Sequence, residues 1–292
     1  MLECVANVSE GRRRDAIERI GAACPQCLLD VHVDADHNRS VFTMVADDSD
    51  EIERCAAQLA HAVARYADDT WHDGVHPRIG ALDVVPFVAL SGTADERAIA
   101  AHTAHDFAQW LAGTLDVPTF LYGDADPAGR SLPSIRRDAF VRRAPDFGPG
   151  EPHPELGATA VGARPELVAV NCVLDDEDVE LASRIAHDVR ERGGGLPGVR
   201  ALGFELASRR RAQVSMNLTE LAATGIEQAC TEVRRLARGA GTSVAGVELV
   251  GLLPRAEFER CSPEFRRWAG LSDDVTIEGR LDSHPLGRRP GA

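Results

Sequence analysis

The sequence WHDGVHPRIGALDVVPFVAL, residues 71–90, sets the organisation of the first half of the chain. Two breakers, Gly74 and Pro77, precede an almost wholly apolar run. This pattern predicts a loop that leads into a buried strand. Loops of this kind often carry reactive groups, and His72 and His76 have the side chain whose ordinary pKa suits proton transfer near neutral pH.

A zinc site is the first alternative for these histidines. His72 and His76 are four residues apart, as two ligands on one helix face would be. Gly74 and Pro77 lie between or beside them and oppose a continuous helix through both. The loop therefore favours catalysis over metal binding, and a polar surface loop remains the other alternative.

Composition limits the class of protein. The chain has 292 residues, of which 44% are hydrophobic and 27% charged, enough to bury one large core or two smaller ones. The N-terminus has no basic and apolar signal segment, and no apolar run is long enough for a membrane span. We expect a cytoplasmic protein with two compact lobes.

The cysteine content predicts free thiols. There are seven cysteines, an odd number, in a chain without an export signal. Cys24 and Cys27 have CxxC spacing, but the pair closes a predicted helix, whereas a redox pair opens one. We therefore predict no redox role and no disulfide framework.

Charge excludes several partners and mechanisms. The net charge of −14 disfavours nucleic acid and anionic membranes, which require a basic face. All 32 cationic side chains are arginines, so the chain has no lysine for a Schiff base, for pyridoxal phosphate or for a phosphate-binding loop. A bound carboxylate would have to meet guanidinium groups, backbone N–H groups or hydroxyls.

Hydrophobic periodicity divides the chain into two similar halves. The first half is predicted as strand Leu2–Val8, helix Arg12–Ala23, strand Leu28–Val33, strand Arg39–Ala46, helix Asp50–Ala67 and strand Ala81–Leu90. The second is predicted as strand Glu166–Leu174, helix Asp178–Arg192, strand Val199–Leu206, strand Ala212–Leu218, helix Gly225–Gly239 and strand Ser243–Val250. Both strings read βαββαβ, which predicts an α+β protein with two ferredoxin-like subdomains.

The remaining segments complete the predicted domain organisation. Helix Asp95–Leu115, strand Val117–Tyr122 and a Pro/Gly-rich connector at 145–157 join the two halves. We expect one subdomain at 1–160, a second at 161–260, and a C-terminal extension at 261–292 with a disordered end. Two sheets that are each covered by helices on one face can pair their open faces, so a cleft between the subdomains is the expected ligand site.

Seven motifs in order resemble the glutamate formimidoyltransferase (formiminotransferase) family, here a stand-alone transferase without a cyclodeaminase domain. They are Asn7–Gly11, Asp36–Thr43, His76–Val84, Asp146–Pro149, Gly157–Arg164, Ala212–Leu218 and Leu249–Pro254. The resemblance spans Leu2 to about Pro254. It implies transfer of the formimino group from N-formimino-L-glutamate to N5 of tetrahydrofolate, giving 5-formiminotetrahydrofolate and L-glutamate.

The resemblance also assigns site residues. His76 falls on the family's catalytic histidine, as general base and then general acid. The family's folate-binding stretch falls on Gly148, Pro149, Gly150, Glu151, Pro152, His153, Pro154, Glu155, Leu156 and Gly157. The chain departs from the vertebrate enzyme at Glu151, His153 and Leu156.

Both substrates carry glutamate carboxylates, so Arg39, Arg78 and Arg164 are candidate substrate-binding residues, with salt bridges inside the core as the alternative for each. Asp34 or Asp36 is a candidate for stabilising the amidinium cation. We expect a His76 ionisation near pH 6 to 7, tetrahydrofolate as co-substrate, no metal, and a homodimer that binds small molecules.

Two other functions remain open on the sequence. One is a metal-dependent formiminoglutamate hydrolase that uses His32, Asp36, His37, His72 and His76. The other is a folate-binding protein without transferase activity. The formyl group is an open alternative to the formimino group in the transfer itself.

Overall fold

A computed structural model describes residues 1–67 and 73–284. The chain divides into two compact units, residues 1–166 and residues 167–292. The predicted element order is correct in both. His72 lies outside the described residues, as do positions 285–292 of the predicted disordered end.

The first unit is built on a six-stranded sheet with the order β2-β3-β1-β4-β6-β5. Its elements are β1 (Leu2–Val8), α1 (Arg14–Gly21), β2 (Leu28–Asp34), β3 (Arg39–Ala46), α2 (Ser49–Tyr66), β4 (Leu82–Ala89), α3 (Ala94–Leu115), β5 (Thr119–Gly123), α4 (Leu132–Asp138) and β6 (Thr159–Ala163). The first four strands are antiparallel neighbours in the ferredoxin-like order, while β6 pairs parallel to both β4 and β5.

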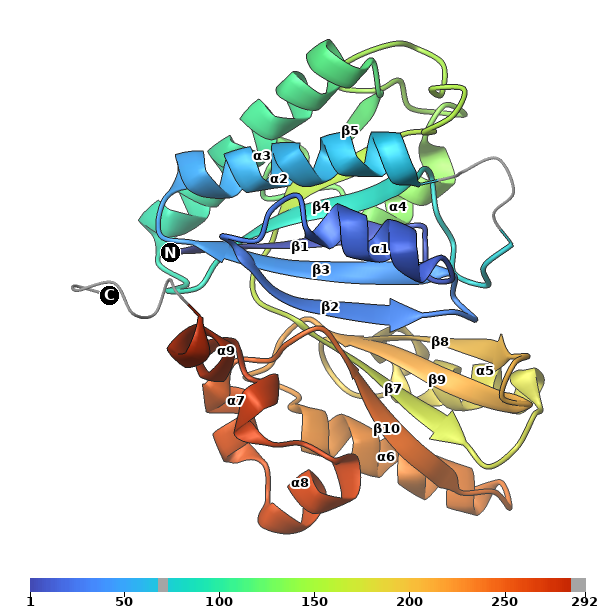
Figure 1. Cartoon of the computed structure of the whole chain (residues 1–292). Helices are drawn as coiled ribbons and strands as arrows, with labels where there is room; N and C mark the ends of the chain where they lie inside the picture. Colours follow the sequence, from blue (N-terminus) through green and yellow to red (C-terminus); the bar gives the residue numbers. More distant parts are fainter. Residues whose placement is uncertain (68–72, 285–292) are drawn as a thin grey trace. The chain divides into compact units, whose positions relative to one another are not determined.

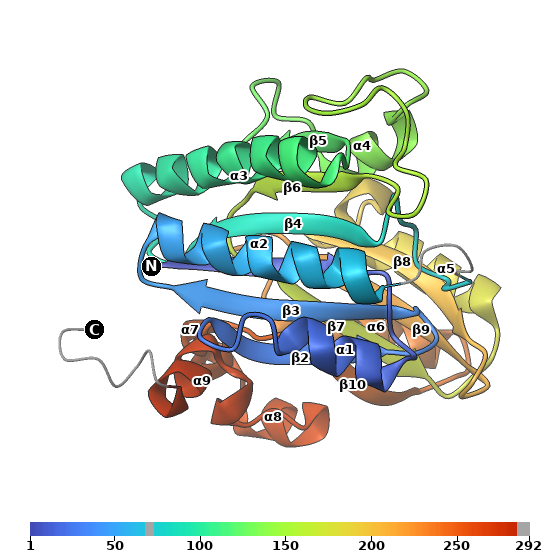
Figure 2. The ribbon, with the colours of Figure 1, turned by 45° about the horizontal axis from the view of Figure 1, so that its top comes forward.

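Helices α1, α2 and α3 lie over one face of this sheet (Figures 1 and 2). Alternation along the strands explains the two-sided packing. Val85 and Val161 belong to the large core beneath these helices, whereas their neighbours Val84 and Ala160 join a smaller core around Ile135 of α4. Helix α4 therefore packs on the opposite face of the sheet from α1, α2 and α3.

The second unit repeats the same strand order. Its elements are β7 (Val168–Leu174), α5 (Val179–Val189), the 3-10 turn η1 (Glu191–Gly193), β8 (Val199–Leu206), β9 (Arg211–Leu218), α6 (Ile226–Gly239), β10 (Val244–Val250), α7 (Arg255–Arg260), α8 (Pro263–Ala269), the 3-10 turn η2 (Asp273–Val275) and α9 (Ile277–Ser283). The sheet order β10-β7-β9-β8 matches β4-β1-β3-β2 of the first unit, strand for strand.

Several features were not predicted. Strand β6 is short and consists of small residues, so it has no hydrophobic period, and helices α4, α7, α8 and α9 are each no longer than seven residues. Because β6 pairs with β4 and β5, residue 160 lies inside the first unit's sheet. No helix within residues 1–67 and 73–284 is long and apolar enough to cross a bilayer.

The prediction of free thiols was correct for five of the seven cysteines and wrong for two. Cys27, just before β2, is disulfide-bonded to Cys55 of α2. Cys24, the other cysteine of the CxxC pair, is a free, buried thiol as predicted. The two bonded cysteines are 28 residues apart in the sequence, so a local sequence pattern cannot predict their pairing.

Gly80 is where the chain enters β4, and it has no room for a side chain. A Cβ atom there would lie 2.3 Å from the carbonyl oxygen of Ala158 and 2.4 Å from that of Leu156. We expect Gly80→Ala to lower the free energy of unfolding by about 1–3 kcal/mol, measured by denaturant titration, because the backbone of residues 156–158 must move.

The matched control for this substitution is Gly113→Ala in α3. A Cβ atom at Gly113 meets nothing within 4 Å, so alanine should stabilise the helix by about 0.5–1 kcal/mol. Equal effects of the two substitutions would contradict the close approach at Gly80.

Candidate active site

The His76 imidazole has a defined tautomer. The side chain is half-buried in the loop before β4, and Nδ1 lies 2.8 Å from the carbonyl oxygen of Pro77. A carbonyl oxygen can only accept a hydrogen bond, so Nδ1 carries the hydrogen and the basic lone pair is on Nε2. The ring is thus arranged to accept a proton at Nε2.

A buried carboxylate organises the charges near His76. Asp83, in β4, is fully buried, and its Oδ2 accepts from Arg39 at 2.8 Å and from Arg136 at 2.5 Å. Its Oδ1 accepts the backbone N–H of Ile79 at 2.7 Å. Arg39 also donates from Nε to Asn7 at 3.1 Å. Two guanidinium groups against one carboxylate leave the cluster with a net positive charge.

This environment keeps His76 neutral. Burial lowers the pKa of His76 to about 2, and the positive charges of Arg39 and Arg136 lower it further than Asp83 and Pro77 raise it. The predicted ionisation near pH 6 to 7 was therefore wrong. The sequence placed Arg78 near the ring, but it gave no sign of Arg136, which comes from α4.

The segment 148–157 is fixed at both ends. At its start, Asp146 accepts the N–H of Leu121 at 2.8 Å and pairs with Arg143 at 2.5 Å. At its end, the N–H groups of Ala81 and Ala158 bond, at 2.9 Å each, to the carbonyl oxygens of Leu156 and Ile79. This second anchor ties the segment to the loop that carries His76.

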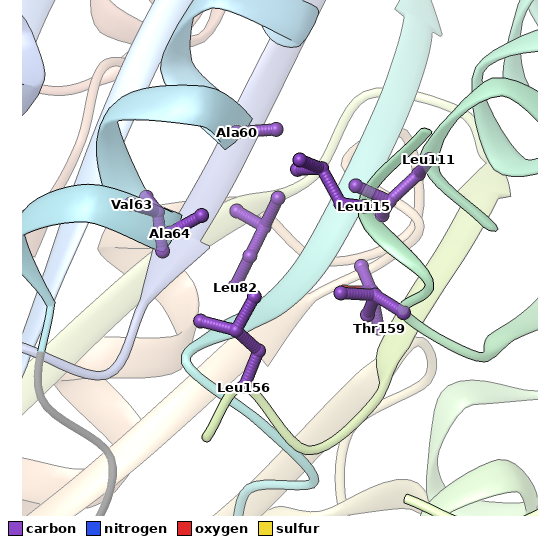
Figure 3. A pocket seen from close by; sticks show the side chains of 9 residues that line it. Ala60, Val63, Ala64, Leu82, Leu111, Leu115, Leu156 and Thr159 are labelled. Atoms are coloured by element: carbon purple, nitrogen blue, oxygen red, sulfur yellow. The ribbon is translucent and has the colours of Figure 1, made fainter. Parts of the chain in front are cut away.

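Within this segment His153 shapes the turn. Its Nδ1 accepts from the N–H groups of Glu155 and Leu156, and its backbone exchanges two hydrogen bonds with Gly157, at 2.8 and 2.9 Å. Gly157 has a φ of +67°, which a glycine adopts without strain. Leu156 lines a small apolar cavity between α2, α3 and β4 (Figure 3). The other members of the segment are largely exposed.

The three candidate arginines have different surroundings. Arg39 is buried and bonded to Asp83, while Arg78 is half-buried in the His76 loop. Arg164 lies elsewhere: its N–H bonds to Phe87 near the far end of β4, and its guanidinium donates to Pro165. With about 3.3 Å per residue, the length of β4 separates the backbone of Arg164 from the end of the strand that follows the His76 loop by about 20 Å. Arg39 and Arg78 belong to the His76 end of the strand, and the Arg164 backbone belongs to the other end.

The turn between β2 and β3 supplies further polar groups. Asp34 is buried, and its Oδ1 accepts the N–H of His37 at 2.8 Å, whereas its Oδ2 has no hydrogen-bond partner among residues 1–67 and 73–284. The ring of His37 lies 5.9 Å from that of His76. In residues 1–67 and 73–284 no three His, Cys, Asp or Glu side chains are grouped to hold a metal ion.

Asp83 and Arg136 are the members of this cluster that our sequence reasoning missed. Asp83 stands as the single charge inside an apolar strand, and a charge at such a position signals a buried partner. Arg136 has no comparable signal, because α4 follows the His76 loop by more than fifty residues and was not itself predicted.

The chain is thus a two-unit α+β protein with a histidine-centred polar site in its first unit. Residues 1–164 match the N-terminal subdomain of the formiminotransferase domain, and residues 169–269 match the formiminotransferase domain. The chain belongs to the formiminotransferase family.

Relatives of known name support this membership. A glutamate formimidoyltransferase of Streptococcus pyogenes is 36% identical over 87% of this chain and 89% of its own length. One from Thermoplasma acidophilum is 34% identical over 97% of both chains. The formimidoyltransferase-cyclodeaminase of Sus scrofa is 40% identical over 87% of this chain, which corresponds to half of the longer protein.

Glu3 forms a second buried charge site, at the end of the sheet where Arg164 lies. Burial raises the pKa of Glu3 to about 7, and the Arg164 charge opposes this shift. Between pH 4.5 and 7 the Glu3 carboxyl group is therefore protonated in the native state, whereas in the unfolded chain it is ionised. The contribution of Glu3 to stability must fall as pH rises from about 4.5 to 7, because the ionised carboxylate is costly to bury.

We expect Glu3→Gln to stabilise the protein relative to wild type at pH 8, by at most about 3 kcal/mol, and to have little effect at pH 4.5. Thermal unfolding at the two pH values measures this difference. Glu18→Gln, at an exposed position in α1, is the control. A gain for Glu3→Gln that is the same at both pH values would contradict a raised pKa.

Proposed function

We propose that this protein transfers the formimino group of N-formimino-L-glutamate to N5 of tetrahydrofolate. The observation that carries the proposal is the neutral His76 imidazole, with its Nδ1–H held by Pro77 and its basic Nε2 near Arg39 and Arg136. The names of the bacterial and archaeal relatives support the same reaction.

The chemistry needs a base that takes a proton from N5 and an acid that gives one to the glutamate nitrogen. When N5 attacks the amidinium carbon, N5 becomes cationic and has to lose its proton, and the glutamate nitrogen has to gain one before it leaves. His76 Nε2 accepts the first proton as a neutral base, and the resulting imidazolium is a strong acid because of its surroundings. No redox step or metal ion is needed, since the amidinium electrophile already carries a positive charge.

Other residues of the first unit fit the binding of the two substrates. The Oδ2 of Asp34, which is buried and has no hydrogen-bond partner within the described part of the chain, is a carboxylate oxygen that suits the amidinium cation. Arg78 is half-buried in the same loop as His76, so we assign it to a glutamate carboxylate. Arg164 would serve only a part of a substrate that extends far from the reacting atoms.

The segment Gly148–Gly157 fits the pterin of tetrahydrofolate chemically. Three prolines leave it with more carbonyl acceptors than N–H donors, and Glu151 and Glu155 add exposed carboxylates. A reduced pterin presents several N–H donors along its edge, which complements such a segment. The hydrogen bonds to Ile79 and Ala81 keep this surface near the His76 loop.

His76→Asn tests the proposal directly. We expect turnover of formiminoglutamate with tetrahydrofolate to fall by roughly 10²- to 10⁴-fold while tetrahydrofolate affinity, measured by fluorescence titration, changes little. Because the pKa of His76 is lowered, the wild-type rate should show no acid limb from this residue between pH 5 and 8.

His72→Asn is the control for this substitution. Equal losses for the two variants would contradict the role of His76. Turnover without tetrahydrofolate that is abolished by a chelator would instead identify a metal-dependent hydrolase, and pterin binding without turnover would identify a binding protein.

Arg78→Ala should raise the KM for at least one glutamate-bearing substrate by about 10- to 150-fold, equivalent to about 1.5–3 kcal/mol for a charge-assisted contact. Initial-rate kinetics with each substrate varied in turn measure this change. Arg97→Ala, at an exposed position in α3, is the matched control. Unchanged KM values with a lower melting temperature would show that Arg78 has a purely structural role.

A further inference from the structure

A second imidazole lies beside His76. The ring centroids of His37 and His76 are 5.9 Å apart, with 37° between the ring planes. His37 is 6% exposed, so it is almost completely withdrawn from solvent, although histidine is a polar residue in a tight turn. Nothing in the transfer described above uses it.

The backbone holds His37 in place. Its N–H bonds to Asp34 Oδ1 at 2.8 Å, and the next residue, Asn38, has a left-handed φ of +46°. The Asn38 side chain accepts the N–H of Gly11 at 2.9 Å, which stabilises this turn from the end of β1. The position of His37 is therefore fixed by the fold of the turn.

The turn is also joined to the loop that carries His76. Arg12 donates to the carbonyl oxygen of Ala35 at 2.9 Å and forms an ion pair with Asp73. The N–H of Val75 points to the carbonyl oxygen of Asp36 at 3.4 Å. These contacts link the two loops just before each histidine, so the approach of the rings is built into the first unit.

The surroundings of His76 make a second proton acceptor useful, and the neighbouring His37 ring can serve as one. A proton taken from N5 has to be kept until the glutamate nitrogen accepts it. His76 is a poor place to keep it, because burial disfavours an imidazolium there and Arg39 and Arg136 repel one. Imidazole nitrogens on rings 5.9 Å apart can exchange a proton through one bridging water.

We propose that His37 is a second proton-transfer residue in the reaction, which receives the proton from His76 and delivers it to the departing glutamate nitrogen. This assignment rests on the proposed function. The proton leaves N5 for His76 Nε2, passes through a water to His37, and ends on the glutamate nitrogen as the carbon–nitrogen bond to glutamate breaks. Both histidines return to their starting protonation states, and no proton is gained or lost overall.

The test uses full-length His37→Gln and His37→Ala, with His102→Gln at an exposed position in α3 as the control. Steady-state kinetics in H₂O and D₂O give kcat, KM and the solvent isotope effect for each variant. Imidazole is added to the His37→Ala protein as an external proton carrier, and melting temperatures report folding.

We expect both His37 variants to lose about 10- to 100-fold in kcat, with KM changed by less than about threefold and with a larger solvent isotope effect. Imidazole should restore part of the kcat of His37→Ala. If His37 were needed only for folding, added imidazole would not restore kcat. His102→Gln should behave as wild type.

Two results would overturn the assignment in distinguishable ways. Wild-type kcat in both His37 variants, or a loss of kcat without imidazole rescue and with a lowered melting temperature, rejects His37 alone. A wild-type protein that binds formiminoglutamate but transfers nothing to tetrahydrofolate rejects the proposed function, and the assignment of His37 with it.

Discussion

The buried carboxylate of Asp83 is the interaction on which the site depends. A charge in the interior is tolerated only when its partners surround it, and Asp83 has two guanidinium groups and one backbone N–H. The partners come from β3, from α4 and from the His76 loop. One side chain thereby aligns a strand, a helix on the opposite face from α1–α3, and the loop with the reactive imidazole. Removing it would leave two arginines facing each other without a counter-charge.

Burial and the excess positive charge of that cluster together explain the chemistry expected of His76. Isolated histidines ionise near neutral pH, and the sequence alone led us to expect the same here. The pKa of His76 is lowered first by burial and then by Arg39 and Arg136, and Arg136 enters from a helix that is distant in the chain. A residue's type can therefore be read from a motif, but its protonation state depends on partners that only tertiary structure supplies.

The fold was far more predictable than the site. Both βαββαβ strings follow from apolar alternation, and the observed boundaries of β8 are those predicted. The small residues of β6 and the Cys27–Cys55 pairing left no periodic trace. In the site, His76 and its loop were found from breakers and histidines, whereas Asp83 and Arg136 required knowledge of which strands and helices meet. Arg164 was selected by residue type, and it lies at the other end of the sheet.

The repeated strand order points to a history of duplication followed by specialisation. Two copies of one ancestral unit would give the matching orders β2-β3-β1-β4 and β8-β9-β7-β10. Only the first copy continues past its fourth strand into a two-strand parallel addition, and the connection within that addition contains residues 148–157. The addition also covers β4, which would otherwise be a sheet edge open to unwanted strand pairing, as β10 is in the second sheet. The addition that covers the edge of β4 thus also gives the first unit the surface formed by residues 148–157, which has no counterpart in the described part of the second unit.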